Sequence, residues 1–281
     1  TLDDMPEILG MTFRKNAEGK PALEGDLDRV PMPTYDNYAS LYEQRKFMHQ
    51  VKARIFFEMS RGCYWGQRKR CIFCGQSSET LRFRKKSRGR IISEVKSLVS
   101  SYPGFSLCLS DESCDAEMLD SLMEALAALE RKPEILYLQV RPDIEISYIK
   151  KLAACGLKRV EAGIESLSSK VLSIIGKGVS ALQNIAFLKG CREAKIVPVW
   201  NFLWGFPGEP EEAYVNMAKI IPLLTHLPPP NYAGPFRLDR FSPCFEGPKE
   251  YGIKQIKPYS SYSFIYPLDE KALSNLASFF T

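Results

Sequence analysis

Three cysteines gathered in one polar segment are the residues of this sequence best suited to chemistry. Thiolates are soft ligands that suit zinc ions or iron–sulfur clusters. The Cys71-x2-Cys74 pair can chelate one centre, and the longer loop lets Cys63 close on it. The spacing therefore predicts a metal centre held by Cys63, Cys71 and Cys74. The full segment reads Ser60-Arg61-Gly62-Cys63-Tyr64-Trp65-Gly66-Gln67-Arg68-Lys69-Arg70-Cys71-Ile72-Phe73-Cys74-Gly75.

Two other interpretations of these cysteines stay open. A structural zinc site usually needs four protein ligands, commonly as two chelating pairs, and this segment offers one pair and one single cysteine. Neither His49 nor His226 completes a standard zinc spacing. Buried cysteines without a metal are the other interpretation, which does not explain three cysteines in a polar loop flanked by glycines. Three ligands on a four-iron cluster leave one iron open, and an open site indicates a catalytic centre.

The surrounding sequence alternates between short apolar strands and amphipathic helices. Such alternation implies parallel strands joined by right-handed crossovers. Five or six units favour an α/β fold, either a partial or full barrel or an open doubly wound sheet, with the reacting groups at the carboxyl ends of the strands. Strands are expected at 55–57, 105–109, 135–140, 160–164, 197–203 and 236–241, and helices at 91–100, 118–129, before Cys155, within 168–195 and from Pro210.

Composition limits the class of protein. The 281 residues include 45% hydrophobic and 25% charged residues, which is ordinary for a globular domain. The net charge of +5 does not by itself indicate a nucleic-acid partner. The sequence has neither an export signal nor an apolar run of about 18 residues that suggests a membrane span. Eight cysteines at this low density, without an export signal, favour free thiols in a reducing, cytoplasmic compartment.

Three parts are expected along the chain. Residues 1–50, with turn formers and charges around Pro31-Met32-Pro33, are interpreted as a linker or a lead-in from an upstream domain that this sequence lacks. Residues 51–245 hold the strand–helix core. Residues 246–281 are interpreted as a C-terminal extension that begins a substrate-capping region.

The cysteine segment and the motifs after it resemble radical S-adenosylmethionine (radical SAM) enzymes, over about residues 55–280. Most of that superfamily has three residues between its first two cysteines, whereas this chain has seven. The longer spacing, the Ser-Arg-Gly-Cys-x-Trp-Gly lead and Phe73 resemble a narrower group, the radical enzymes of ribosomal peptide natural-product maturation, which commonly carry an upstream cobalamin domain. Further matches follow in order: Gly163-Ile164-Glu165-Ser166, Lys177-Gly178-Val179, Leu182-Gln183-Asn184, Trp200-Asn201, Gly205-Phe206-Pro207-Gly208-Glu209 and Arg237-Leu238-Asp239-Arg240-Phe241-Ser242-Pro243.

The resemblance implies a partial (β/α)6 TIM-like barrel with a 4Fe–4S cluster on the three cysteines. Its open iron would bind the amino and carboxylate groups of S-adenosylmethionine, and one electron would release a 5′-deoxyadenosyl radical. The expected outcome is modification of an unactivated carbon, as in C-methylation of a ribosomal peptide. Another cobalamin-linked reaction, the anaerobic oxidative cyclisation of a tetrapyrrole, and a non-catalytic zinc-stabilised binding module are the alternatives.

The same resemblance implies partners. A peptide or small-molecule substrate and a reductant such as flavodoxin or ferredoxin are expected, and neither a membrane nor a nucleic acid is. The Asp-x-His-x-x-Gly signature of base-off cobalamin binding is absent from the sequence. Cobalamin would therefore come through a domain outside this chain.

Several residues match positions that contact the cofactor in the superfamily. Phe73 is expected near the adenine, or alternatively in the core. Asp111 and Glu112 end the second strand, where a carboxylate can pair with the methionine ammonium group, although the usual Gly-Gly-Glu is missing and capping of the next helix is the alternative. Arg141 is expected to reach the carboxylate of the cofactor. Glu165 is expected to accept from the ribose hydroxyls or to form a structural ion pair.

The last strands supply further candidates. Gly205 and Gly208 would let the backbone approach the adenine, although a tight turn alone also explains them. Asn201 is assigned to the cofactor site, and with Asp239 and Arg240 it is expected to face the substrate cavity. The basic run at 82–90 is interpreted as a solvated face, or as a surface that steers an anionic peptide leader or RNA. The cysteines outside the loop are expected to be core residues: Cys108, Cys114, Cys155, Cys191 and Cys244.

Overall fold

Eight short parallel strands form the centre of the computed structural model, which describes residues 25–45, 50–77 and 80–281. They pair as three small sheets, and the isolated bridges Ile135–Leu157 and Glu165–Phe202 link them. Two strand positions are interrupted, at Leu138 and at Trp200, so the eight strands occupy six positions of a partial (β/α)6 barrel. This is the fold class that the sequence predicts. The sheets are β1 (Arg54–Phe57), β4 (Ser106–Leu109) and β5 (Ile135–Tyr137); β6 (Gln139–Val140), β7 (Arg159–Ala162) and β8 (Val197–Val199); and β9 (Asn201–Trp204) with β10 (Tyr232–Pro235).

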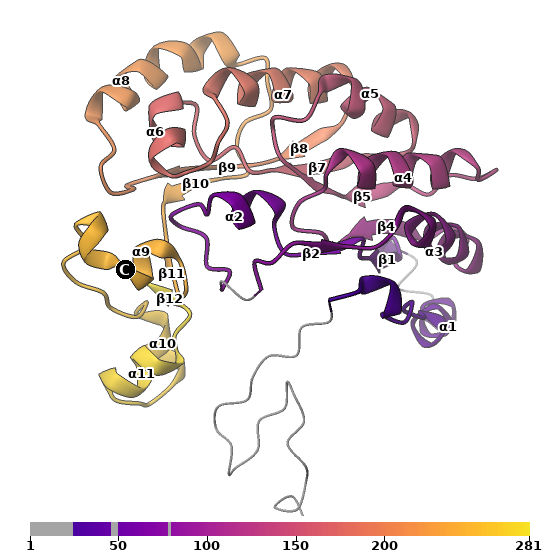
Figure 1. The fold of residues 1–281 in the computed structure, drawn as a ribbon, viewed down its shortest axis with the longest axis horizontal. Coiled ribbons are helices and arrows are strands. Elements are labelled where there is room, and N and C mark those ends of the chain that lie inside the picture. Colours follow the sequence, from indigo (N-terminus) through magenta and orange to yellow (C-terminus); the bar gives the residue numbers. More distant parts are fainter. Residues whose placement is uncertain (1–24, 46–49, 78–79) are drawn as a thin grey trace, which may run out of the picture.

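Helices follow the strands and cover one side of them, as Figure 1 shows for α4 to α8 above the strands. Side chains cap several of these helices: Ser87, Asp115, Ser168 and Ser180 each accept a backbone N–H of the first turn, which supplies a partner for donors that the helix itself leaves free. The apolar faces of α3, α4, α5 and α7 pack with the strands into the main core. The helices are α3 (Arg88–Ser101), α4 (Ala116–Ala127), α5 (Ile146–Ala154), α6 (Ser169–Ile174), α7 (Ala181–Glu193) and α8 (Glu211–Ile220).

The described part of the expected lead-in packs against the edge of the barrel. It contains a 3-10 turn (Leu27–Arg29) and α1 (Asp36–Gln44). The hydroxyl of Tyr35 donates to the carbonyl oxygen of Phe56 in β1 (2.7 Å), and that of Tyr102 donates to Asp36 Oδ1 (2.8 Å). Residues 1–24 and 46–49 of the expected lead-in lie outside the described residues. Its role as a link to another domain stays a prediction.

The sixth strand lies earlier than the sequence predicts. The barrel strand is β10, before Phe236, whereas part of the expected range 236–241 forms β11 (Leu238–Asp239), which pairs antiparallel with β12 (Phe279–Phe280). The apolar residues of this range were misread because they pack into a second core with Ile72 and Phe280, not against the barrel strands. The last elements are α9 (Pro243–Glu246), a 3-10 turn (Pro248–Tyr251), α10 (Ser261–Ile265) and α11 (Glu270–Leu276).

The basic run is not a uniform solvated face. Lys86 and Glu94 form a buried ion pair (2.6 Å), and Arg90 also binds Glu94 (2.6 Å). Lys85 pairs with Asp115 and Glu117, and Arg88 pairs with Glu124. The sequence shows only the cations of this run, because their acidic partners lie on α3 and α4. The expected solvated face is wrong for Lys86, which is buried, whereas Arg88 is exposed as expected and is paired.

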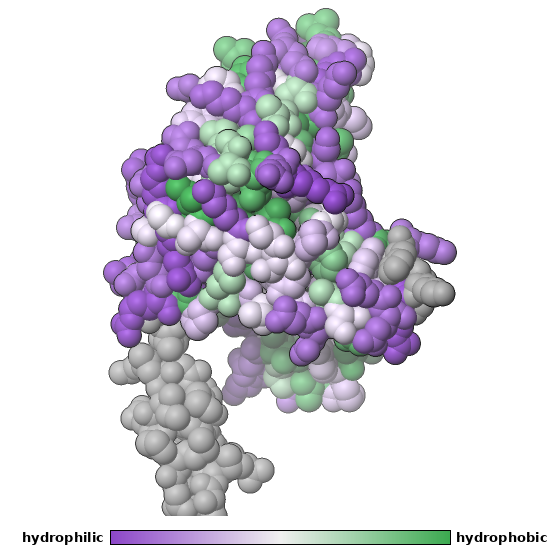
Figure 2. Space-filling model, turned by 90° about the vertical axis from the view of Figure 1, so that its right-hand side faces the viewer, coloured by the Kyte–Doolittle hydropathy of each residue, from purple (hydrophilic) through white to green (hydrophobic). Residues whose placement is uncertain are grey.

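Hydrophilic side chains dominate the face shown in Figure 2, with small hydrophobic patches between them. Among the helices that the structure describes, none has the length and apolar character needed to cross a membrane. All eight cysteines are free thiols, and the five outside the cysteine loop are buried, as predicted.

Candidate active site

A short helix fills the long interval between the first two cysteines of the loop. The loop begins at β2 (Ser60–Arg61), which pairs antiparallel with β3 (Arg84–Lys85). Cys63 caps α2 (Tyr64–Arg68), because its Sγ accepts the N–H of Gly66 (3.4 Å). The N–H of Cys74 donates to the carbonyl oxygen of Cys71 (3.1 Å). The seven-residue spacing is therefore accommodated by one helical segment between the cysteines.

The segment between α6 and α7 fixes the position of this loop. The indole Nε1 of Trp65 donates to the carbonyl oxygen of Gly176 (2.9 Å), and the Arg141 guanidinium lies 4.4 Å from the centre of the Trp65 ring. The N–H of Ile72 donates to the carbonyl oxygen of Ile175 (3.1 Å). The Lys177-Gly178 motif noted in the sequence thus follows the stretch that anchors the cysteine loop.

The three cysteine thiols lie within electrostatic range of one another and are partly exposed. Burial raises the pKa of the Cys71 thiol, and the nearby cations Lys177 and Arg141 oppose that effect. Burial likewise raises the pKa of Cys74, against the backbone N–H of Gln76 and the charge of Arg70. Cations beside thiolates stabilise the charged form in which cysteine binds iron. Three soft thiolates are a donor set that fits an iron–sulfur cluster. In the described ranges, no three His, Cys, Asp or Glu side chains form a group that could hold a metal ion.

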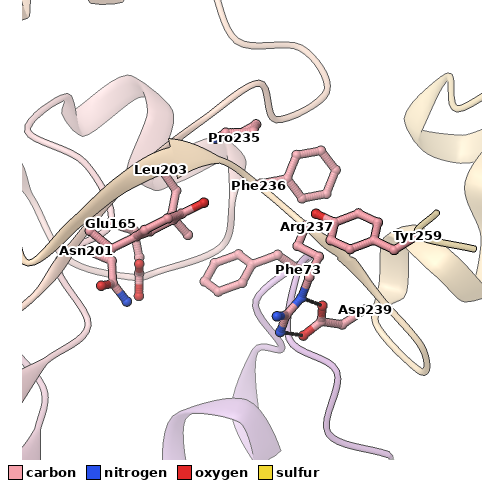
Figure 3. Close-up of a pocket in the computed structure, with 10 residues that line it drawn as sticks. Phe73, Glu165, Asn201, Leu203, Pro235, Phe236, Arg237, Asp239 and Tyr259 are labelled. Carbon is pink, nitrogen blue, oxygen red and sulfur yellow. Dashed lines mark hydrogen bonds and ion pairs between the residues drawn. The ribbon is translucent and has the colours of Figure 1, made fainter. Parts of the chain in front are cut away.

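A cavity of about 530 Å³ opens beside the cysteine loop, within the range of small-molecule sites. Phe73, which lies between Cys71 and Cys74, forms one wall, and residues at the carboxyl ends of β7, β9 and β10 form others (Figure 3). Glu165 follows β7, at the strand end that the fold predicts for reacting groups, whereas Asn201 and Tyr232 are the first residues of β9 and β10. The lining consists of Phe73, Glu165, Asn201, Leu203, Tyr232, Pro235, Phe236, Arg237, Asp239 and Tyr259.

Glu165 both faces a cavity and forms an ion pair, whereas the sequence left a ligand contact and an ion pair as alternatives. It lines the cavity, and its Oε1 lies 3.1 Å from Lys177 Nζ, with 11% and 12% of the two side chains exposed. Its backbone has a positive φ of 57°. Burial by itself lowers the pKa of Lys177, but the charges of Glu165 and Cys71 outweigh burial and raise that pKa. Lys177 therefore links the cavity carboxylate to the cysteine loop.

Phe73 belongs to an aromatic row along the cavity. Its ring centre lies 5.4 Å from that of Phe206, which stacks on Phe236 at 4.9 Å. Lys177 Nζ lies 5.7 Å from the Phe73 ring centre. Phe73 also packs against the second core, as one of its two expected positions requires, and its contact with adenine stays a prediction.

Asp111 holds the start of the cysteine loop. Its Oδ1 accepts from the N–H of Met59 (3.0 Å) and from the N–H and hydroxyl of Ser60. The residue is 1% exposed, and burial raises its pKa to about 6 in spite of these hydrogen bonds. The expected capping role is wrong for both Asp111 and Glu112, because Asp115 caps α4. Glu112 is exposed, and its charge raises the pKa of Cys74.

The raised pKa of Asp111 predicts a dependence of stability on pH. The Asp111 carboxyl binds its proton more tightly in the folded protein than in the unfolded chain. Its contribution to the free energy of unfolding is therefore complete below about pH 4 and is lost as the pH rises through about 6. Asp111→Asn cannot ionise. Between pH 4 and pH 8, the wild type should therefore lose about 3 kcal/mol of unfolding free energy that the variant does not lose. Urea titrations of the metal-free chain measure this; parallel pH profiles would contradict it.

Two predicted arginines lie away from this cavity. Arg141 binds Asp143 Oδ2 (2.9 Å) and the carbonyl oxygen of Lys177 (3.1 Å), and it lines a second cavity of about 610 Å³. Arg240 donates to the carbonyl oxygens of Ala277 (2.6 Å) and Ser274. Its expected place in the substrate cavity is wrong, because the C-terminal extension takes up its donors. Asn201 and Asp239 line the first cavity, and their role as residues that face the substrate stays a prediction.

The structure explains Gly205 and Gly208 by a tight turn, which the sequence left as the alternative to contact with adenine. Gly205 and Gly208 have φ values of 84° and 81°, which glycine adopts without strain. Glu209 Oε2 accepts the N–H of Gly205 (2.8 Å) and of Phe206 (3.2 Å), which closes the turn. Neither glycine is among the residues that line the described cavity. Contact of this backbone with adenine stays a prediction.

Three cavity residues or neighbours received no role from the sequence. Lys177 and Arg237 belong to motifs recognised in the sequence, but the motifs do not show their partners. In the structure Lys177 pairs with Glu165, and Arg237 Nη2 lies 3.0 Å from Asp239 Oδ2. Tyr259 comes from the C-terminal extension, where no sequence pattern pointed to a site.

Comparisons with known proteins agree with this geometry. The model of the radical SAM superfamily matches residues 57–221, more than half of the chain. An uncharacterized methyltransferase of Pyrococcus horikoshii is 27% identical over 233 residues, which cover 77% of this chain and 48% of that protein. The chain therefore spans about half the length of this curated relative.

Solved structures share the fold at low sequence identity. The cobalamin-dependent S-adenosylmethionine radical enzyme OxsB, with aqua-cobalamin and S-adenosylmethionine bound, has a TM-score of 0.64 at 16% identity, over 87% of this chain and 41% of that one. The radical S-adenosylmethionine methyltransferase TsrM from Kitasatospora setae, with tryptophan substrate and a SAM analogue bound, has a TM-score of 0.60 at 16% identity, over 75% and 42%. With the partial barrel and the three-cysteine loop at its mouth, the family match shows that this chain belongs to the radical SAM superfamily, whose cofactors are a 4Fe–4S cluster and S-adenosylmethionine.

Proposed function

We propose that this chain is the radical SAM domain of a methyltransferase that modifies an unactivated carbon of a ribosomal peptide. The observation that carries the proposal is the cavity beside the cysteine loop, because Phe73 lies between two of the cysteines and also forms a cavity wall. When bound, the 4Fe–4S cluster and S-adenosylmethionine supply the 5′-deoxyadenosyl radical. The chain's own residues bind and orient these groups and keep water away from them.

Each residue has a proposed part in this arrangement. Cys63, Cys71 and Cys74 hold the cluster, and the exposed carboxylate of Glu112, close to Cys74, binds the ammonium group of the cofactor. Glu165 accepts hydrogen bonds from the ribose hydroxyls while Lys177 balances its charge. Phe73 and Phe236 line the cavity, cover the adenine and exclude water, with the buried ring of Phe206 behind them, and Asn201 faces the reacting carbon. Arg141 acts indirectly, because it supports Trp65 and the carbonyl of Lys177.

Two similar proteins support methyl transfer and cobalamin in the proposal. The Pyrococcus horikoshii relative is described as a methyltransferase, and OxsB, which shares this fold, was solved with aqua-cobalamin. The peptide substrate rests on the motif resemblance. In the proposal, cobalamin binds to a segment outside this sequence, a flavodoxin or ferredoxin supplies electrons, and the reaction takes place in the cytoplasm.

The test uses the full-length protein, reconstituted anaerobically with iron, sulfide and cobalamin. With a reductant, S-adenosylmethionine carrying a deuterated methyl group and the candidate precursor peptide, we expect 5′-deoxyadenosine, S-adenosylhomocysteine and a labelled peptide. Mass spectrometry measures all three products. Deoxyadenosine without label in the peptide would exclude methyl transfer but keep radical cleavage. A colourless protein with one zinc would exclude both.

The Glu165–Lys177 pair predicts strong coupling between two cavity residues. Lys177→Met leaves the buried carboxylate of Glu165 without a partner, which should cost about 3 kcal/mol of unfolding free energy. Glu165→Gln in the same background removes that charge and should restore about 2 kcal/mol. Urea unfolding of the two single variants and the double variant measures the coupling. Additive effects of the two substitutions would show that the pair does not interact.

A further inference from the structure

Exposed positive charge lies on the cysteine loop, on residues that the proposed chemistry does not use. Arg68 and Lys69 stand at the carboxyl end of α2, between Cys63 and Cys71 in sequence, and both are exposed. Arg82, just before β3, is exposed as well. Within the ranges that the structure describes, none of the three side chains forms an ion pair. We call Arg68, Lys69 and Arg82 the loop patch.

Backbone contacts hold the parts of the loop patch together beside a cluster cysteine. The N–H of Phe83, the neighbour of Arg82, donates to Gln67 Oε1 (2.8 Å), and Gln67 precedes Arg68. The N–H of Cys63 donates to the carbonyl oxygen of Leu81 (3.2 Å). The loop patch is therefore fastened to the same short stretch of structure as Cys63.

The loop patch borders the second cavity, of about 610 Å³. Arg68 lines this cavity together with the aromatic rings of Tyr64 and Phe83, whose centres are 5.8 Å apart in an edge-to-face contact. No residue lines both this cavity and the one that holds Glu165. The second cavity thus reaches the cysteine loop at Tyr64, next to Cys63, whereas the first reaches it at Phe73.

Among the described residues, no ion pair neutralises the loop patch. Two acidic residues of the second cavity pair with other cations, Asp115 with Lys85 (2.7 Å) and Asp143 with Arg141 (2.9 Å), whereas Glu145 accepts the neutral hydroxyl of Ser147 (3.2 Å). Uncompensated charge of one sign raises the rate and affinity of association with a partner of opposite sign. The partner that fits this surface is therefore acidic.

We propose that the loop patch is the docking surface for an acidic protein that donates one electron. The inference rests on the proposed function, in which the donor loses one electron and the metal centre on the three cysteines gains it, with no bond made or broken at the patch. Electron transfer slows steeply with distance, so a donor must approach the cysteines closely. An RNA partner would not need to lie close to the cysteines. The position of the loop patch beside Cys63 therefore favours an electron donor over an RNA as its partner.

The test compares charge reversal in the patch with charge reversal elsewhere. The test variant is Arg68→Glu/Lys69→Glu/Arg82→Glu, and Arg68→Lys/Lys69→Arg/Arg82→Lys keeps the charge. The matched control, Lys158→Glu/Arg159→Glu/Lys195→Glu, changes net charge equally at exposed positions near the amino ends of β7 and β8. The probe is flavodoxin. Its Kd is measured by calorimetry, and deoxyadenosine formation is measured with reduced flavodoxin and separately with dithionite, which needs no docking.

We expect charge reversal in the patch to raise the Kd for flavodoxin at least about tenfold at low salt. Flavodoxin-driven deoxyadenosine formation should fall as much, while dithionite-driven formation stays at the wild-type level. The difference should shrink between about 50 mM and about 500 mM salt, because salt screens exposed charges. The charge-keeping variant and the matched control should behave like the wild type.

Equal Kd values for the patch variant and the wild type would overturn the proposal, and so would an equal loss in the matched control. Binding of a single-stranded RNA probe that depends on the patch, without such binding of flavodoxin, would also overturn it. If dithionite yields no deoxyadenosine with the wild type, the proposed function fails instead. The calorimetric Kd still tests the docking surface in that case, because it needs no turnover.

Discussion

Replacing Cys71 by alanine should lower deoxyadenosine formation on the order of 1,000-fold or more, because a reaction that needs an intact cluster does not survive loss of a ligand. Iron content after anaerobic reconstitution should fall from about four per chain, and the brown absorption near about 400 nm should disappear. Iron analysis, absorption spectra and product chromatography measure these changes. Cys63→Ala and Cys74→Ala should behave in the same way, since the three thiols share one site.

Cys155→Ala provides the control for this prediction. Cys155 is also a free cysteine, but it lies in the main core, away from the cysteine loop. The variant should keep its iron and its turnover, with only a small loss of stability from the smaller side chain. If the Cys71 variant retained wild-type iron and wild-type deoxyadenosine formation, the assignment of the metal centre to this loop would be wrong.

Gly178→Ala should be among the most damaging substitutions outside the cysteines. A Cβ at this position would lie 2.0 Å from the Trp65 ring, and the backbone φ is +70°. The Trp65 ring cannot move away easily, because its Nε1 donates a hydrogen bond to the carbonyl oxygen of Gly176 and the Arg141 guanidinium lies over the ring. We expect a loss of about 3 kcal/mol or more in unfolding free energy, the sum of backbone strain and overpacking, and poor cluster incorporation because Trp65 anchors the cysteine loop.

Gly252→Ala separates these two causes. Gly252 has the same φ of +70°, but an added Cβ meets no atom within 4 Å. This variant should lose only the strain component, about 1–2 kcal/mol, and should incorporate iron normally. Urea midpoints and iron content of the two variants give the comparison. Equal losses for both would show that the Trp65 contact does not matter.

Local sequence patterns were enough to predict most of the strands and helices and the cysteine loop. Five of the six strand positions and the flanking helices follow from alternating and helical periodicity. The structure brings Phe73, Glu165, Asn201 and Asp239 together at one cavity, and their roles toward cofactor and substrate stay predictions. Glu165 follows the barrel strand β7, whereas Phe73 lies in the cysteine loop, Asn201 begins β9 and Asp239 lies in β11. The order of the elements therefore explains the position of Glu165 but not that of the other three.

What sequence reasoning missed depends on contacts between distant segments. The misplaced sixth strand and the misassigned Arg240 have one cause, the C-terminal extension, which pairs with β11 and takes the donors of Arg240. The pairing of Lys177 with Glu165, and of the basic run with acidic residues on α3 and α4, likewise cannot be read from spacing. A charged residue shows its type in the sequence but not its partner.

The wall contributed by the C-terminal extension has a consequence for the order of events during biosynthesis. The carbonyl oxygen of Ile72, inside the cysteine loop, accepts the N–H of Cys244 (3.0 Å), and Tyr259 completes the cavity. A ribosome adds only about 5–20 residues per second, so the cysteines emerge many seconds before these late neighbours. The nascent loop lacks these two neighbours during that interval, so faithful loading of iron belongs after the C-terminal extension has been synthesised.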